Sequence, residues 1–225
     1  MSRPQIRVEW IGRERTPIVI IDDLAPAPED LRQAACALNF VAMTGQYYPG
    51  TRAVAPDDYF EAVFPPVVAA MNEFYQCPRP LLRRCYYSLT CTPPDELTSE
   101  QTMPHFDTML EGHFAVVHFL CAEQFGGTAF FAHRQTGFET ITIARHGHYA
   151  ACLAEELAGG GTLPCSYPGG SSPWFEKIAA VAARENRAVI FPGKLLHSAD
   201  VANAQLLSAD PMVGRLTVVS FLSRE

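Results

Sequence analysis

The chain has 225 residues, of which 48% are apolar and 18% are charged, and its formal net charge is −7. This size and composition fit one domain, residues 1–225, that builds its own hydrophobic core, and they exclude a disordered chain or a coiled coil. The acidic balance and the lack of a basic run argue against nucleic acid as a partner. No apolar run approaches the length of a membrane span, so we expect no membrane contact.

The chain contains seven cysteines, an odd number, and none of them forms a C-x-x-C pair. Several lie inside apolar segments, which is typical of reduced, buried thiols rather than of a disulfide framework. The first ten residues lack the apolar core of a signal peptide. These observations together predict a cytoplasmic protein.

The first 80 residues are expected to form two strands and two helices. Residues 6–10 and 17–21 are apolar and β-branched, and a polar turn separates them. A helix is predicted over 26–40, with proline and acids in its first turn, and a second over 57–75, kinked or broken at its Pro-Pro pair. The segment 44–56 is rich in glycine, proline and aromatic residues, which predicts a loop.

Residues 81–225 change to short β-branched or aromatic segments separated by turn residues. This spacing predicts about eight strands of a sandwich or barrel, with one helix inserted at 146–161. The chain is therefore expected to be mainly β, of the α+β class, with its N-terminal helices packed on one sheet. The expected strands are 81–92, 103–109, 113–122, 127–134, 138–144, 177–183, 187–193, 195–201 and 215–222.

A pair of metal-ligand residues stands in the stretch QTMPHFDTM, where His105 and Asp107 are two residues apart. On a strand this spacing puts both side chains on one face. A third ligand is available at His197, just past a predicted strand. Two imidazoles and one carboxylate make the facial triad that holds Fe(II) in non-haem oxygenases. The alternative is a hydrogen-bonded His–Asp pair with a purely structural role.

The last predicted strand supplies a candidate anion site. Arg215 and Thr217 are two residues apart in GRLTVVSFL and so share a face. Arginine binds a carboxylate through two parallel hydrogen bonds, and a neighbouring hydroxyl can donate another. A barrel that binds 2-oxoglutarate needs such a cation for the distal carboxylate, with the other end of the cosubstrate on the metal.

The pieces YYPGTR, MPHFDT, GGTAFFAHRQTGFE and NRAVIFPGKLLHSADV resemble the DUF6445 family over nearly the full chain. Residues 81–225 also resemble the double-stranded β-helix, a cupin-like jelly roll, of the Fe(II)/2-oxoglutarate-dependent dioxygenases. The resemblance implies Fe(II) at His105, Asp107 and His197, with 2-oxoglutarate at Arg215 and O2 as the co-reactant. An intact Asp107 is the pattern of hydroxylases, since related halogenases carry a small residue there.

Other residues are candidates for the cosubstrate or substrate. His118 lies on the predicted strand 113–122, where prolyl-hydroxylase-like barrels carry a polar cosubstrate ligand; a core histidine is the alternative. Gln101 has even spacing to the His–Asp pair and could face the same pocket. Tyr48 and Arg52 lie in the Gly/Pro loop and could form a lid over the substrate. Arg52 and Arg134 hint at an acidic group on the substrate.

The sequence thus predicts an Fe(II)/2-oxoglutarate-dependent hydroxylase that acts on a C–H bond of a small molecule, such as an amino acid or a carrier-tethered intermediate. Three alternatives stay open: a cupin-like metalloenzyme that does not use 2-oxoglutarate, a zinc hydrolase, and a jelly-roll binding module that has lost turnover.

Overall fold

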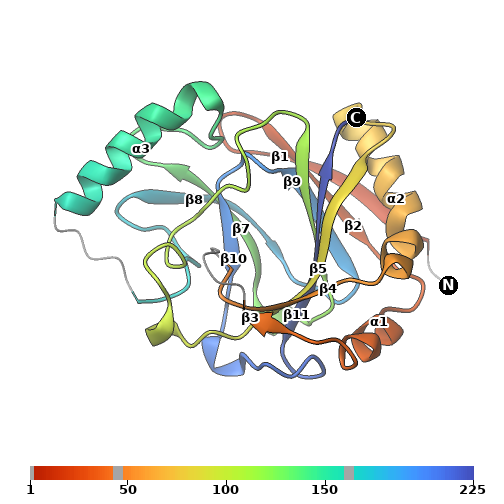
Figure 1. Ribbon diagram of the computed structural model, residues 1–225. Helices are drawn as coiled ribbons and strands as arrows, with labels where there is room; N and C mark the ends of the chain where they lie inside the picture. The colour runs from red at the N-terminus through yellow and green to blue at the C-terminus, as the bar shows by residue number, and fades with distance from the viewer. Residues whose placement is uncertain (1–2, 43–47, 160–164) are drawn as a thin grey trace.

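A computed structural model describes residues 3–42, 48–159 and 165–225, and within them the chain is mostly β. Two antiparallel sheets pack face to face, and Figure 1 shows α2 on the far side of the larger one. In spatial order the large sheet contains β1 (Gln5–Ile11), β2 (Thr16–Asp22), β9 (Arg187–Pro192), β6 (His113–Phe119), β11 (Arg215–Ser223), β5 (Leu81–Thr90), β4 (Gly50–Val54) and β3 (Val41–Ala42). The small sheet contains β10 (His197–Asp200), β7 (Gly127–His133) and β8 (Phe175–Ala182).

Three α-helices accompany the sheets: α1 (Pro28–Ala35), α2 (Asp57–Tyr75) and α3 (Ile143–Ala158). Three short 3-10 helices lie at η1 (Pro94–Glu96), η2 (Glu123–Phe125) and η3 (Ala204–Leu206). None of the helices in the described residues is long and apolar enough to cross a membrane.

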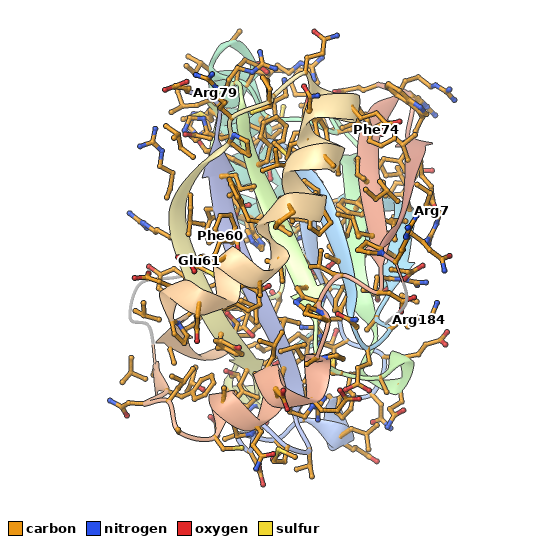
Figure 2. All side chains as sticks on the ribbon, turned by 90° about the vertical axis from the view of Figure 1, so that its right-hand side faces the viewer. Arg7, Phe60, Glu61, Phe74, Arg79 and Arg184 are labelled. Carbon is orange, nitrogen blue, oxygen red and sulfur yellow. The ribbon has the colours of Figure 1, made fainter. Side chains whose placement is uncertain are left out.

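The large sheet buries both of its faces, because alternate residues of each central strand enter different cores. One face packs on α2, where Val63, Val67 and Met71 repeat at helical spacing and lie against β5 and β11. Figure 2 shows this helix crossing in front of the strands, with Phe60 in its first half and Phe74 near its end. The expectation that N-terminal helices pack on one sheet is therefore confirmed.

The other face of the large sheet looks toward the small sheet. There the rings of Phe191 on β9 and Phe130 on β7 meet edge to face, with centroids 5.2 Å apart. Such pairs stabilise beyond the area they bury. The space between the two sheets is not filled by side chains throughout, and the candidate site lies in the part that stays open.

Several sequence expectations are corrected by the structure. The segments 103–109 and 138–144 are not strands, since each makes only one isolated bridge, the first to His197 at the start of β10 and the second to Leu195 just before it. The first helix is shorter than 26–40, and α2 runs through both of its prolines without a break. Strand β4 occupies part of the expected loop 44–56, of which residues 43–47 lie outside the described chain.

Candidate metal centre and adjoining cavity

The segment that contains His105 and Asp107 is fixed by backbone hydrogen bonds to the segment 193–197. His105 and His197 exchange N–H···O bonds of 2.9 and 2.8 Å, and the Asp107 N–H donates to the Gly193 carbonyl at 2.7 Å. The reason expected for the convergence of the two side chains, a regular strand, is therefore wrong. Their convergence comes instead from this short pairing, which also brings His197 alongside.

The three side chains predicted as ligands meet at one point. The Nε2 atoms of His105 and His197 lie 4.0 and 3.7 Å from the two carboxylate oxygens of Asp107, and all donor atoms lie within 4.8 Å of one another. Neighbouring ligands of an octahedral ion with bonds of about 2.1 Å lie about 3 Å apart, so small side-chain rotations would close this set around one ion. Two imidazoles and a carboxylate suit a borderline metal such as Fe(II). The residues present thus fit a single ion.

A hydrogen bond outside the ligand set orients one imidazole. His197 Nδ1 lies 2.7 Å from the carbonyl oxygen of Leu195, and because a carbonyl only accepts, this ring nitrogen carries the proton. Nε2 then keeps its lone pair and faces Asp107. Metal-binding histidines in proteins are commonly held in this way. The tautomer is therefore already the one that a metal ion needs.

Burial favours the neutral forms of the other two ligands, because it lowers the pKa of His105 and raises the pKa of Asp107. Desolvation lowers the pKa of His105 well below its usual value, and electrostatic interactions with His197 and Arg52 act in the same direction. Desolvation raises the pKa of Asp107, and His197 and Arg52 partly oppose that rise. A neutral His105 can ligate directly, whereas Asp107 ionises more readily once a cation is near.

The three residues line a cavity of about 580 Å³ between the sheets. Four of the other residues predicted to bind cosubstrate or substrate line the same cavity: Tyr48, Arg52, Arg215 and Thr217. The volume is that of a small-molecule site. Residues from both sheets and from the 105–108 segment thus converge on one space.

Arg215 is buried at one end of this cavity, with 2% of its surface exposed. Its guanidinium donates to the carbonyl oxygens of Phe125 and Gly127 at 3.2 and 2.5 Å and to Thr90 Oγ1 at 3.0 Å. No carboxylate of the described residues forms an ion pair with it. A buried cation is costly without a counter-charge, so this arrangement points to an anionic ligand. Thr217, two residues on, is also buried and faces the cavity.

Tyr48 links the described part of the loop 44–56 to this end of the cavity. Its hydroxyl lies 3.0 Å from Thr90 Oγ1, the same atom that accepts from Arg215. The Arg52 guanidinium stacks over the Tyr48 ring at 4.2 Å and lies 5.6 Å from the Tyr86 ring. Burial raises the pKa of Tyr48 and lowers that of Arg52. Both side chains therefore form part of the cavity wall.

His118 does not contribute to the cavity. It lies on the α2 face of β6, fully buried, with Nδ1 3.0 Å from the Tyr59 hydroxyl and Nε2 3.1 Å from Asn186 Oδ1. Burial lowers its pKa to about 4, so the ring is neutral near pH 7. It is a core histidine with two side-chain partners. The prediction that it binds the cosubstrate is therefore wrong.

Two of the expected substrate residues also lie away from the cavity lining. Gln101 donates to the Tyr48 carbonyl at 3.2 Å and accepts from the Thr98 N–H, so it fastens a loop. Arg134 donates to the Ser172 carbonyl at 2.9 Å and lies 3.9 Å from Glu176. Both roles are structural in this arrangement.

Sequence reasoning missed Thr90, Tyr86 and Arg84, three residues of β5 that lie near or line the cavity. Their even spacing in LLRRCYYSLTCT was a usable signal, because residues two apart on a strand share a face. What the sequence did not reveal is that this face meets Arg215. Thr90 and Arg215 are directly opposite in the β5–β11 register but 125 residues apart in the chain.

Comparison with solved structures identifies proteins of similar fold at low sequence identity. The crystal structure of the non-heme alpha ketoglutarate dependent epimerase SnoN from nogalamycin biosynthesis aligns with a TM-score of 0.53 and 13% identity, over 94% of this chain and 79% of that one. HygX from Streptomyces hygroscopicus, with nickel and 2-oxoglutarate bound, gives a TM-score of 0.49 and 11% identity, over 95% of this chain and 87% of that one.

The chain belongs to the DUF6445 family, a family of unknown function whose model matches residues 2–222. The family resemblance read from the sequence is therefore confirmed. No curated protein matches the sequence.

Proposed function

We propose that the protein is an Fe(II)/2-oxoglutarate-dependent oxygenase that hydroxylates a C–H bond of a small molecule. The observation that carries the proposal is the buried Arg215, which has no described acidic partner and shares one cavity with the His105–Asp107–His197 cluster. The two facing sheets support the finer description as a double-stranded β-helix of one domain. Nickel and 2-oxoglutarate in the similar HygX agree with the proposed ligands.

The register of the small sheet supports one cosubstrate bound between the metal site and Arg215. His197 lies opposite Phe130, and Asp200 lies opposite Gly127, whose carbonyl accepts from Arg215. His197 and Asp200 are three residues apart on β10, so the metal site and the Arg215 contact are separated by about 10 Å along the strand. The arginine side chain and a five-carbon dicarboxylate can fill that length together.

Each residue then has one task. His105, Asp107 and His197 would hold Fe(II) on one face and leave the opposite face to ligands. Arg215 would bind the distal carboxylate of 2-oxoglutarate, and Thr90 holds Arg215 in place through its hydroxyl. Bound Fe(II) and 2-oxoglutarate would supply the oxidising power for C–H cleavage with O2, while the cavity walls keep bulk water away.

The test is an anaerobic titration with Fe(II) and then 2-oxoglutarate, monitored by the visible metal-to-ligand charge-transfer absorption. We expect a band in the wild type, none in His197→Ala, and a weak one in Arg215→Ala. His148→Ala, exposed on α3 and outside the cavity lining, is the matched control and should behave as the wild type.

The other outcomes separate the alternatives. Metal binding without the band, unaffected by Arg215→Ala, would support a cupin-like metalloenzyme that does not use 2-oxoglutarate. Failure to bind any divalent metal would support a binding module.

A further inference from the structure

One face of β5 lines the cavity in the first part of the strand and reaches Arg215 at its end. Cys85, Tyr87 and Leu89 point into the core beneath α2, whereas Arg84 and Tyr86 line the cavity and Thr90 bonds to Arg215. Six residues of strand separate Arg84 from Thr90, about 20 Å along the axis. The cavity therefore has an arginine at each end of this row.

The two ends differ in burial. Arg215 is enclosed, whereas Arg83 and Arg84 lie in the exposed first part of β5. Arg84 is opposite Phe221 on β11, and its side chain forms no hydrogen bond or ion pair with a described residue. Arg83 donates to Ser223 Oγ at 2.7 Å and likewise has no described acidic partner. The outer end is thus a cationic mouth without counter-charges in the described chain.

The charge of the cavity opposes that of the whole chain. Its described lining contains four arginines, at 52, 83, 84 and 215, and a single carboxylate, Asp107, in a protein of net charge −7. With Fe(II) and 2-oxoglutarate bound, the ion and Arg215 would balance Asp107 and the dicarboxylate. The positive charges of the arginines nearer the mouth would then have no counter-charge in the cavity. A recess with apolar walls strengthens the positive electrostatic potential that they produce.

Between the mouth and the metal ligands the walls are mainly apolar. Strands β6, β9 and β11 supply aliphatic and aromatic side chains that face inward, and Phe106 of the 105–108 segment also lines the cavity. The inward-facing apolar residues are Ala115, Val117, Phe191, Val219 and Phe221. A ligand there would bury an uncharged body and leave a charged end near Arg84.

We infer that the substrate of this site is a small molecule with an apolar body and one terminal anionic group, a carboxylate or phosphate, which Arg84 binds at the cavity mouth. The reactive C–H bond would lie on the apolar body, next to the metal ligands. The inference rests on the proposed function for the reaction, but the binding preference does not depend on turnover.

The test is calorimetric titration of matched probes into anaerobic protein that holds Fe(II) and saturating 2-oxoglutarate, so that Arg215 is occupied. The probes are hexanoate, 3-phenylpropanoate and N-acetyl-leucine, each beside its primary amide, together with hexyl phosphate beside hexanol. We expect at least one anion to bind about tenfold more tightly than its neutral partner, as charge-assisted hydrogen bonds do.

Substitution locates the preference. Arg84→Gln should bring the ratio of the two affinities to within twofold. Arg79→Gln, which removes an exposed arginine between α2 and β5 that does not line the cavity, should leave the ratio unchanged (Figure 2). The inference is wrong if every anion binds no better than its neutral partner, or if the preference survives Arg84→Gln.

The same measurements on metal-free protein separate this inference from the proposed function. If titration with Fe(II) and 2-oxoglutarate gives no charge-transfer band, but metal-free protein still shows a preference that depends on Arg84, the anion site is supported and the oxygenase is contradicted. A preference lost only in Arg215→Gln would place the anion at the cosubstrate end, and the inference about the mouth would be wrong while the oxygenase stands.

Discussion

At the scale of single residues, Thr90 joins two residues that the sequence predicted for the site, Arg215 and Tyr48. Its hydroxyl accepts from Arg215 and also pairs with Tyr48, so it fixes the guanidinium and the adjoining wall at once. Valine has nearly the same shape but can do neither. A hydrogen bond to a charged group contributes about 1.5–3 kcal/mol.

We therefore expect Thr90→Val to weaken 2-oxoglutarate binding about tenfold, since the lower end of that range corresponds to a factor of about ten. Fe(II) affinity should stay within twofold, because the ligands themselves are untouched. Both constants can be measured from the charge-transfer titration. Thr90→Ser keeps the hydroxyl and should restore binding. Equal weakening of Fe(II) and 2-oxoglutarate would instead indicate general damage to the cavity.

His118 makes the stability of the fold depend on pH. Its pKa is lowered to about 4 in the folded protein, against about 6.5 in the unfolded chain. Between these two values the unfolded chain binds a proton that the folded protein does not. The free energy of unfolding should therefore fall as pH falls from 6.5 to 4, by up to about 1.4 kcal/mol per pH unit, and this contribution is constant outside that window.

Urea denaturation at several pH values measures this slope. His118→Gln removes the titrating group, so its slope between pH 6.5 and 4 should be shallower than that of the wild type by up to one proton. The variant should be less stable at pH 7, because the bonds to Tyr59 and Asn186 are disturbed, yet bind Fe(II) normally. An unchanged slope would mean that His118 does not titrate in this window.

At the scale of elements, the metal ligands depend on how closely the 105–108 segment approaches Gly193. A Cβ at position 193 would lie 3.0 Å from Thr108 Cγ2 and 3.6 Å from Asp107 Cβ. The Asp107 N–H also donates to the Gly193 carbonyl. The absence of a side chain at this position thus sets the place of the carboxylate.

Gly193→Ala should move the 107–108 backbone by a few tenths of an ångström and weaken Fe(II) binding several-fold, because a metal site tolerates little displacement of its ligands. The far-ultraviolet circular dichroism should not change. Gly147→Ala is the control, since its Cβ would meet nothing within 4 Å, and in a helix it should be neutral or stabilising. Unaltered Fe(II) affinity in Gly193→Ala would show that this approach does not position Asp107.

The sequence predicted the elements in which local pattern and final packing agree. Strands β1, β2, β6, β7, β9 and β11 alternate or run apolar between turn residues, and α2 has helical apolar spacing. The segments 103–109 and 138–144 have equally strand-like composition. They fail as strands because each pairs at only one position, which depends on a distant segment rather than on local propensity.

The candidate site divides in the same way. His105, Asp107 and His197 were recognisable because their residue types and order define a ligand set, and the structure brings them together. The neighbours of Arg215 were not recognisable, since Thr90 reaches it through the pairing of β5 with β11 and Gly127 through the packing of the two sheets, each across more than 80 residues. The prediction that His118 binds the cosubstrate was wrong because both faces of its strand are buried. The alternation of side chains along a strand does not say which face packs on α2.

At the scale of the whole molecule, the proposed ligands would join the two sheets. His197 opens β10 of the small sheet, and Arg215 opens β11 of the large sheet while donating to the carbonyl of Gly127 on β7. A metal ion and 2-oxoglutarate bound between them would require both sheets to be in place. Such ligands bind the folded chain alone and shift the unfolding equilibrium by mass action.

Fe(II) at a hundredfold excess over its dissociation constant should therefore stabilise the protein by about 2.7 kcal/mol. For a chain of this size that corresponds to a rise in melting temperature of about 5–10 °C. Adding 2-oxoglutarate at the same excess should give a further rise of similar size, and a chelator should remove both. Anaerobic differential scanning calorimetry measures each step. The 2-oxoglutarate step should shrink in Arg215→Ala, which lacks the distal contact, and vanish in His197→Ala, which lacks the metal. A 2-oxoglutarate effect that survives in metal-free wild type would show that Arg215 binds dicarboxylates without the metal centre, and the cosubstrate role would then need another explanation.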